Sequence, residues 1–266
     1  MALAAGLAGC DRGPQVPPAP VVAATNSYLA SAVQDITNGT VAVVSFAPPG
    51  TCPGHFDLRP SQVDQLRRCR LLLRFDFQQA IDAHLLDGQA GPAVASIEVP
   101  GALCEPASYL SVCRQVGQRL VACGLARAQD AQRQAGEVER RMAELSRRLR
   151  GQVQQAGLTD RPVLCSGHQE GFCRWLGLNV VRTFRGGDSD SLGQLDEAVR
   201  TGRQAGAKLI VANRPEGRGA ADALAEKLGA QVVVFDNFPA EPMQTGTFES
   251  MIQQNVDRLI QADGHE

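Results

Sequence analysis

Residues 127–156 read RAQDAQRQAGEVERRMAELSRRLRGQVQQA, a stretch without proline that is rich in Ala, Gln, Arg and Glu. Its apolar side chains recur at steps of three and four residues, which places them on one face of a long helix. These positions are Ala128, Ala131, Ala135, Val138, Met142, Leu145, Leu149 and Val153. Arginine and glutamate are interleaved over the rest, as expected of a solvated face. A coiled-coil dimer is the alternative, although the apolar seam is weak in Leu and Ile.

Short apolar runs alternate with helical patterns on both sides of this helix. The expected strands are 40–46, 71–73 and 93–99 before it, and 163–166, 179–184, 208–212 and 231–235 after it. Helices are expected between them, one of them with Ser61 as its N-cap, and a closing helix over 248–261. Such alternation predicts mainly parallel sheets. The predicted fold class is therefore α/β, with two lobes joined by one long rigid backbone helix.

The same patterns divide the chain into four parts. The predicted boundaries are 1–22 for a signal remnant and Pro-rich tether, 23–125 for the N-terminal lobe, 126–157 for the linking helix, and 158–266 for the C-terminal lobe. A ligand of such a protein is expected in the cleft at the carboxyl ends of the strands.

Charge and composition exclude several functions. The 266 residues include 26 Lys and Arg against 28 Asp and Glu, a formal net charge of −2. A chain so close to neutral has no electrostatic basis for binding nucleic acid. Aromatic residues make up only 5% of the chain, which argues against stacking platforms for bases or sugars.

The first residues predict that the protein is located in the cell envelope. Leu7-Ala8-Gly9-Cys10 resembles a bacterial lipobox, in which the signal is cut before a cysteine that is then acylated. The segment has no basic region and is too short for a full signal peptide, so a truncated start is expected. A chance run of small residues is the alternative. Residues 11–20 are rich in proline and read as a tether. We therefore predict a lipid anchor on Cys10 that holds the protein to the bacterial membrane.

Seven of the eight cysteines remain after Cys10. Some should pair in an oxidising compartment, and the odd number leaves at least one free or bound to a ligand. No two cysteines have the C-x-x-C spacing, so a zinc ribbon or a thioredoxin-like motif is not supported.

Five segments, in order, carry a family resemblance. They are ATNSYLASAVQDITNG (24–39), FAPPGTCPGHFDLRPSQVDQLRRCRLLL (46–73), HQEGFCRWLGLNVV (168–181), GAKLIVANRPEGRGAADALAEKLGAQVVVFDNFP (206–239) and NVDRLIQA (255–262). Together with the long helix, they resemble the solute-binding proteins of zinc and manganese ABC transporters, the TroA-like or ZnuA-like family. The resemblance implies a monomeric periplasmic protein that is not an enzyme, binds Zn²⁺ (alternatively Mn²⁺) and delivers it to an ABC permease.

The family binds one metal with about four side chains from both lobes, typically histidines and an acidic residue. The resemblance implies His55, in the PPG…H segment, as the first ligand, His168 as the second-lobe histidine and Asp236 as the acidic ligand. A gapless alignment would place Ser166 at the position of His168, and Glu170 is the fallback on the same turn. The alternatives are a surface loop for His55 and a turn or N-cap role for Asp236.

The remaining ligand is where the chain departs from the family pattern. Gly101 stands about where a histidine is usual, and only Cys104 and Glu105 nearby can bind a metal. Cys104 is the predicted fourth ligand, which would favour zinc. It could equally pair with Cys52 or be a buried thiol, in which case three side chains and water would hold the metal.

Three other functions are alternatives to metal transport. Gly217-Arg218-Gly219 after a strand superficially copies a dinucleotide-binding turn, but Asp222 at the third glycine position would repel a pyrophosphate. The same fold can bind an iron chelate or a corrinoid, which the single Trp and two Tyr disfavour. A metal chaperone or adhesin with this fold stays open.

Overall fold

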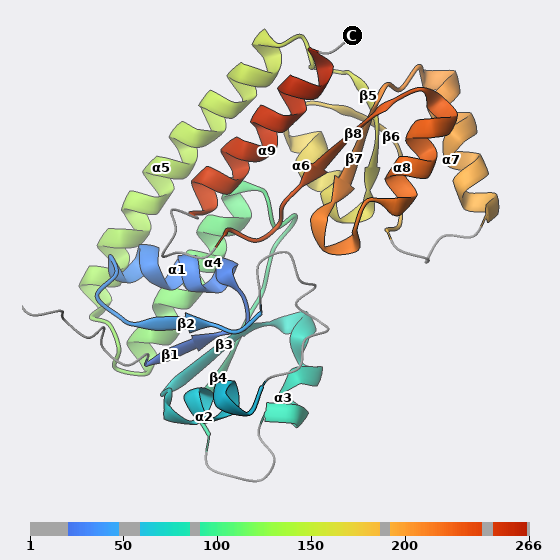
Figure 1. The fold of residues 1–266 in the computed structure, drawn as a ribbon. Coiled ribbons are helices and arrows are strands. Elements are labelled where there is room, and N and C mark those ends of the chain that lie inside the picture. The colour runs from blue at the N-terminus through green and yellow to red at the C-terminus, as the bar shows by residue number, and fades with distance from the viewer. Residues whose placement is uncertain (1–20, 48–58, 86–90, 187–191, 241–246, 265–266) are drawn as a thin grey trace, which may run out of the picture.

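The computed structural model describes residues 21–47, 59–85, 91–186, 192–240 and 247–264. The chain forms two α/β lobes, and the long helix α5 (Ala128–Gln155) runs along one side of both (Figure 1). The predicted fold class is therefore confirmed.

The first lobe is built on four parallel strands in the order β2-β1-β3-β4. Their bounds are Val43–Ser45 for β2, Val22–Ala24 for β1, Leu71–Phe75 for β3 and Ala93–Ile97 for β4. The helical segments of this lobe are α1 (Ser27–Thr37), α2 (Pro60–Arg68), the 3₁₀ turn η1 (Asp76–Gln78) and α3 (Ala80–Leu85). Asn26 starts α1 as a side-chain cap that accepts a hydrogen bond from the amide of Leu29, at 3.1 Å.

The second lobe repeats the plan with the parallel order β6-β5-β7-β8. Its strands are β6 (Asn179–Phe184), β5 (Pro162–Ser166), β7 (Leu209–Asn213) and β8 (Gln231–Phe235). Its helical segments are η2 (Gly167–Gln169), α6 (Glu170–Trp175), α7 (Leu192–Ala205), η4 (Arg214–Glu216), α8 (Gly219–Leu228) and α9 (Phe248–Asp263). Every residue of β7 is buried, as expected of a central strand covered on both faces.

Helix α4 (Pro106–Ala122) leads through a short turn into α5, and the two helices pack side by side. Six of the eight predicted apolar positions of α5 are buried: Ala131, Val138, Met142, Leu145, Leu149 and Val153. This face contacts α1, α4 and α9 of the same chain. Because the chain itself covers this face, a coiled-coil dimer is not needed to bury it.

Helix α9 ties the two lobes together. It follows the last strand of the second lobe but lies alongside α5 (Figure 1). Its first residue, Phe248, packs between Tyr28 and Tyr109 of the first lobe. Arg141 on α5 adds ion pairs to Asp35 on α1, at 2.7 Å, and to Glu249 on α9, at 2.9 Å. One apolar cluster therefore runs through both lobes.

One local expectation needs correction. Helix α2 starts at Pro60 with Arg59 as its N-cap, instead of being capped by Ser61, because proline suits the first helical position. No disulfide joins two of the described cysteines, which are Cys69, Cys104, Cys113, Cys123, Cys165 and Cys173. Cys10 and Cys52 lie outside the described residues. In the part of the chain that the structure describes, no helix is both long enough and apolar enough to cross a membrane.

Candidate metal site in the interlobe cleft

A cleft of about 790 Å³ opens between the lobes, at the carboxyl ends of both sets of strands. The first lobe contributes the segments after β3 and β4: Asp76, Phe77, Val99, Gly101, Ala102 and Leu103. The second lobe contributes the segments after β5, β7 and β8: Gly167, His168, Glu170, Gly171, Arg174, Asn213, Pro215, Glu216, Asn237 and Phe238. The topology thus brings together residues far apart in the sequence, in the place where the sequence predicts a ligand.

His168 lies in the 3₁₀ turn directly after β5 and lines this cleft. The hydroxyl of Ser166 starts the turn by accepting a hydrogen bond from the backbone amide of His168, at 3.2 Å. The imidazole is 69% exposed, and its Nε2 atom is 3.7 Å from Oε1 of Glu216. The side chain is therefore accessible from the cleft and has a carboxylate beside it.

Glu216 ends the turn η4 after β7, and its side chain is 20% exposed at the wall of the cleft. Its Oε2 atom accepts a short hydrogen bond from the hydroxyl of Ser166. Its Oε1 atom accepts one from the backbone amide of Gly186, at 3.3 Å. A side chain at Gly186 would collide with that of Glu216. Ser166, at the position that a gapless alignment assigns to a ligand, therefore supports both His168 and this carboxylate.

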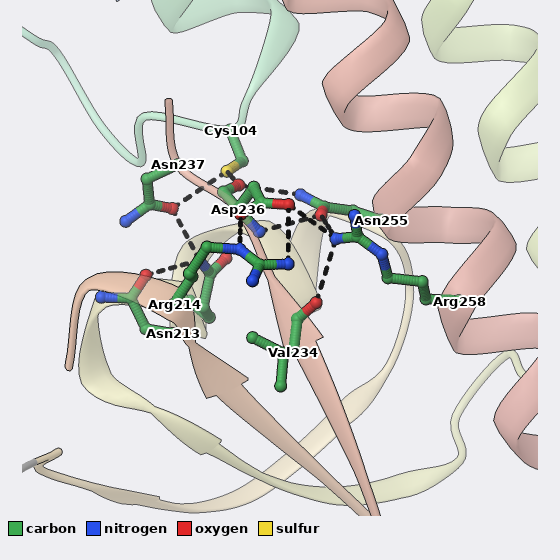
Figure 2. Close-up of polar contacts among 9 residues, drawn as sticks. Cys104, Asn213, Arg214, Val234, Asp236, Asn237, Asn255 and Arg258 are labelled. Atoms are coloured by element: carbon green, nitrogen blue, oxygen red, sulfur yellow. Dashed lines mark hydrogen bonds and ion pairs between the residues drawn. The ribbon is translucent and has the colours of Figure 1, made fainter. Parts of the chain in front are cut away.

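Asp236 follows β8, and its carboxylate is held by two arginines (Figure 2). Arg214 donates to Oδ1 through Nε, in a short contact, and to Oδ2 through Nη2 at 3.4 Å. Arg258 donates to Oδ2 at 2.7 Å. Asn255 holds the backbone of Asp236 in addition, with one hydrogen bond to its amide and one to its carbonyl, both 2.9 Å. Both carboxylate oxygens therefore have cationic partners.

Cys104 is buried where the first lobe meets the end of β8. Its thiol donates to the carbonyl oxygen of Asp236 and to Oδ1 of Asn237, each at 3.2 Å (Figure 2). Burial raises the pKa of this thiol well above its usual range, and the negative charge of Asp236 adds to the effect. The thiol is thus a protonated hydrogen-bond donor, whereas a metal-bound cysteine must be a thiolate.

The raised pKa of this thiol should make the free energy of unfolding depend on pH. Because its folded-state pKa is raised, Cys104 stabilises the fold fully below its unfolded pKa of about 8.5 and less above it, where only the unfolded chain ionises. From pH 7.5 to 9.5, we expect wild type to lose about 1.4 kcal/mol more unfolding free energy than Cys104→Ser. Urea denaturation under reducing conditions measures this difference. Equal losses in the two proteins would contradict it.

Of the other two predicted site residues, Glu170 lies within the described residues and His55 lies outside them. The fallback Glu170 lines the cleft, and its Oε1 atom forms an ion pair with Arg174 at 2.9 Å. His55 lies outside the described residues, in the segment that follows β2. The carboxyl end of β2 lies at the same edge of the parallel sheet as those of β3 and β4, the edge that faces the cleft. Among the described residues, no three His, Cys, Asp or Glu side chains form a group that could hold a metal.

Comparison with known proteins supplies the family. The model of the ZnuA family, described as the periplasmic component A of the zinc-uptake complex, matches residues 22–262. The chain belongs to the ZnuA family. No curated protein sequence matches it.

Solved structures that resemble this ZnuA-family chain share its fold at low sequence identity. The Mn-bound periplasmic metal-binding protein of candidatus Liberibacter asiaticus is 13% identical, with a TM-score of 0.75 over 91% of this chain and 98% of that one. The Cd-bound form is 14% identical, with the same TM-score and coverage. A structure titled ZnuA is 14% identical, with a TM-score of 0.75 over 92% and 99% of the two chains. The family model over residues 22–262 confirms the resemblance inferred from the sequence, and these structures share the fold.

Sequence reasoning did not find one cleft residue of this ZnuA-family member. Glu216 follows the predicted strand 208–212 by four positions, so its place after a carboxyl strand end was an available signal. The glycines that follow it, Gly217 and Gly219, suggest only a dinucleotide-binding turn. The contact of Glu216 with His168 joins residues 48 positions apart, and only the tertiary structure brings them together.

Proposed function

We propose that this chain is an extracytoplasmic solute-binding protein that holds a divalent transition metal in the interlobe cleft and delivers it to an ABC permease. Zinc is the proposed cargo and manganese the alternative. The observation that carries the proposal is the family match over residues 22–262, together with the exposed imidazole of His168 in the cleft. The similar solved structures include forms titled Mn-bound and Cd-bound, which supports a divalent cation as the cargo.

His168 from the second lobe and His55 from the first are the ligands that we assign most directly. Neutral imidazole nitrogens suit zinc, and a site that mixes imidazole with carboxylate can also hold manganese. The sequence predicts Asp236 and Cys104 as the other two ligands. Binding to Asp236 would have to displace two arginines from its carboxylate, and binding to Cys104 would require a buried thiol to lose its proton.

Delivery to the permease would involve little movement between the lobes. Helix α9 packs on α5 and inserts Phe248 into the first lobe, so a wide hinge opening would break buried contacts. We propose a small tilt of the lobes on binding, with release when the permease draws them apart. A lipid on Cys10 would keep the monomer at the membrane beside its permease.

Metal binding tests this function directly. The purified protein is analysed for its metal content and titrated calorimetrically with zinc and with manganese. We expect one ion per chain, and we expect His168→Ala and His55→Ala each to lower the affinity by about 100-fold or more. His265→Ala is the matched control, since it changes a histidine of the C-terminal tail. A wild-type protein that binds neither ion would refute the function, whereas wild-type affinity in both alanine variants would refute the assigned histidines.

A further inference from the structure

We propose that Glu216 binds the metal together with His168, and that Asp236 instead positions the turn that carries Glu216. The inference rests on the proposed metal-binding function and deepens it, because it selects the carboxylate that completes the site. It starts from an asymmetry between two acidic residues that follow neighbouring strands of the second sheet, β7 and β8.

The charges around Asp236 oppose a cation. Arg214 and Arg258 together occupy both oxygens of its carboxylate. A divalent ion that replaced them would approach two guanidinium groups, which repel it. Asp236 therefore serves as the anion of a three-residue ion-pair cluster, and this role leaves no oxygen free for a metal.

Glu216 has the opposite surroundings. Its hydrogen bonds come from two neutral donors, the hydroxyl of Ser166 and the backbone amide of Gly186. Among the described residues, the one basic side chain within ion-pair distance is His168. Glu170, the other carboxylate of the second lobe in the cleft wall, is paired with Arg174. Glu216 is thus the second-lobe cleft carboxylate whose negative charge is not already compensated by an arginine there.

The distance between Glu216 and His168 suits a shared ion. Zinc binds imidazole nitrogen and carboxylate oxygen at about 2.1 Å, so two such ligands of a tetrahedral ion lie about 3.4 Å apart. The atoms Nε2 of His168 and Oε1 of Glu216 are 3.7 Å apart. A displacement of a few tenths of an ångström would bring both to one ion, and the exposed imidazole is free to make it.

The two acidic residues are linked through one turn. Arg214 begins η4 and Glu216 ends it, so the ion pair of Arg214 with Asp236 fixes the start of the segment that carries Glu216. Ser166 fixes its side chain from the other side. Asp236 thereby acts on the metal at a distance, as a positioning residue, and its loss should weaken binding less than the loss of a ligand.

Titration of isosteric variants with zinc tests the assignment. Glu216→Gln is expected to lower the zinc affinity by more than about 100-fold, and Asp236→Asn by about 10-fold or less. Glu226→Gln is the matched control, since Glu226 is exposed on α8. Far-UV circular dichroism confirms that each variant is folded. In parallel, anomalous scattering from zinc in crystals of the wild-type protein locates the ion independently of any variant, and we expect it beside Glu216.

The outcomes separate this inference from the function on which it rests. Wild-type affinity in Glu216→Gln, a larger loss in Asp236→Asn than in Glu216→Gln, or a zinc peak beside Asp236 would overturn the choice of Glu216 while the metal-binding function stands. A wild-type protein that binds no metal would overturn both. A large loss in Glu216→Gln with the zinc peak between residues 168 and 216 would support the inference.

Discussion

Replacing Phe248 with alanine is expected to lower the free energy of unfolding by about 3–5 kcal/mol. The side chain is 1% exposed and lies at the start of α9. Its ring stacks on Tyr109 with the centroids 4.0 Å apart and meets the edge of Tyr28 at 5.6 Å. The loss combines the apolar area with a cavity that the surrounding aromatic rings cannot fill. Because this contact joins the two lobes, its loss should also loosen α9 from the first lobe.

Urea denaturation measures the change in Phe248→Ala, and hydrogen exchange of the α9 amides reports the local loosening. Phe77→Ala is the matched control. Phe77 is 59% exposed, and its ring stacks only on that of Phe75 among the described aromatic residues. Its removal should therefore lower the free energy of unfolding by about 0.5 kcal/mol. Equal losses in the two variants would show that the aromatic cluster around α9 does not hold the lobes together.

A leucine in place of Gly171 is expected to weaken metal binding without removing a ligand. Gly171 lies on α6, where the second lobe meets the first. A Cβ atom there would be 2.8 Å from the Cβ of Ala102 and 2.9 Å from Oε1 of Glu105. Both neighbours belong to the first lobe, so the new side chain must push the lobes apart. The overpacking should cost about 1–3 kcal/mol of stability, and the wider cleft should lower zinc affinity by at least about 10-fold.

Calorimetry with zinc and thermal denaturation test the Gly171→Leu variant. Gly136→Ala is the control for a helical glycine, since a Cβ atom at Gly136 on α5 would meet nothing within 4 Å. That variant should be more stable by about 0.5–1 kcal/mol, because alanine is the better helix former, and its zinc affinity should not change. If Gly171→Leu kept wild-type zinc affinity, the distance between the lobes at this contact would not matter for binding.

The long helix and most of the strands followed from local patterns, whereas the order of the strands in each sheet did not. The apolar spacing of α5 predicted the buried face from Ala131 to Val153, and the apolar runs predicted the described strands except β1 (Val22–Ala24). Such features can be predicted because buried positions recur with the period of the helix or strand. The residues of a short segment are therefore enough to identify them. The position of α9 was not predicted, since its packing on α5 depends on contacts between distant segments.

The site was only partly predictable for the same reason. His168 lines the cleft because it follows a strand end in a parallel sheet, and its role as a ligand stays a prediction. The sequence did not predict which carboxylates form ion pairs with arginines and which do not. Asp236 carries two arginines that lie 22 positions before and after it, whereas Glu216 meets a histidine 48 positions away.

The sequence by itself determined the fold class, the family resemblance, and the cleft at the strand ends as the place for a ligand. These depend on periodic burial and on the order of motifs, and both can be determined from the linear sequence. Only the tertiary structure decided which charges neutralise one another, because electrostatic pairing depends on distances in space between residues that are remote in sequence. The roles that we propose for Glu216 and Asp236 depend on that second kind of information.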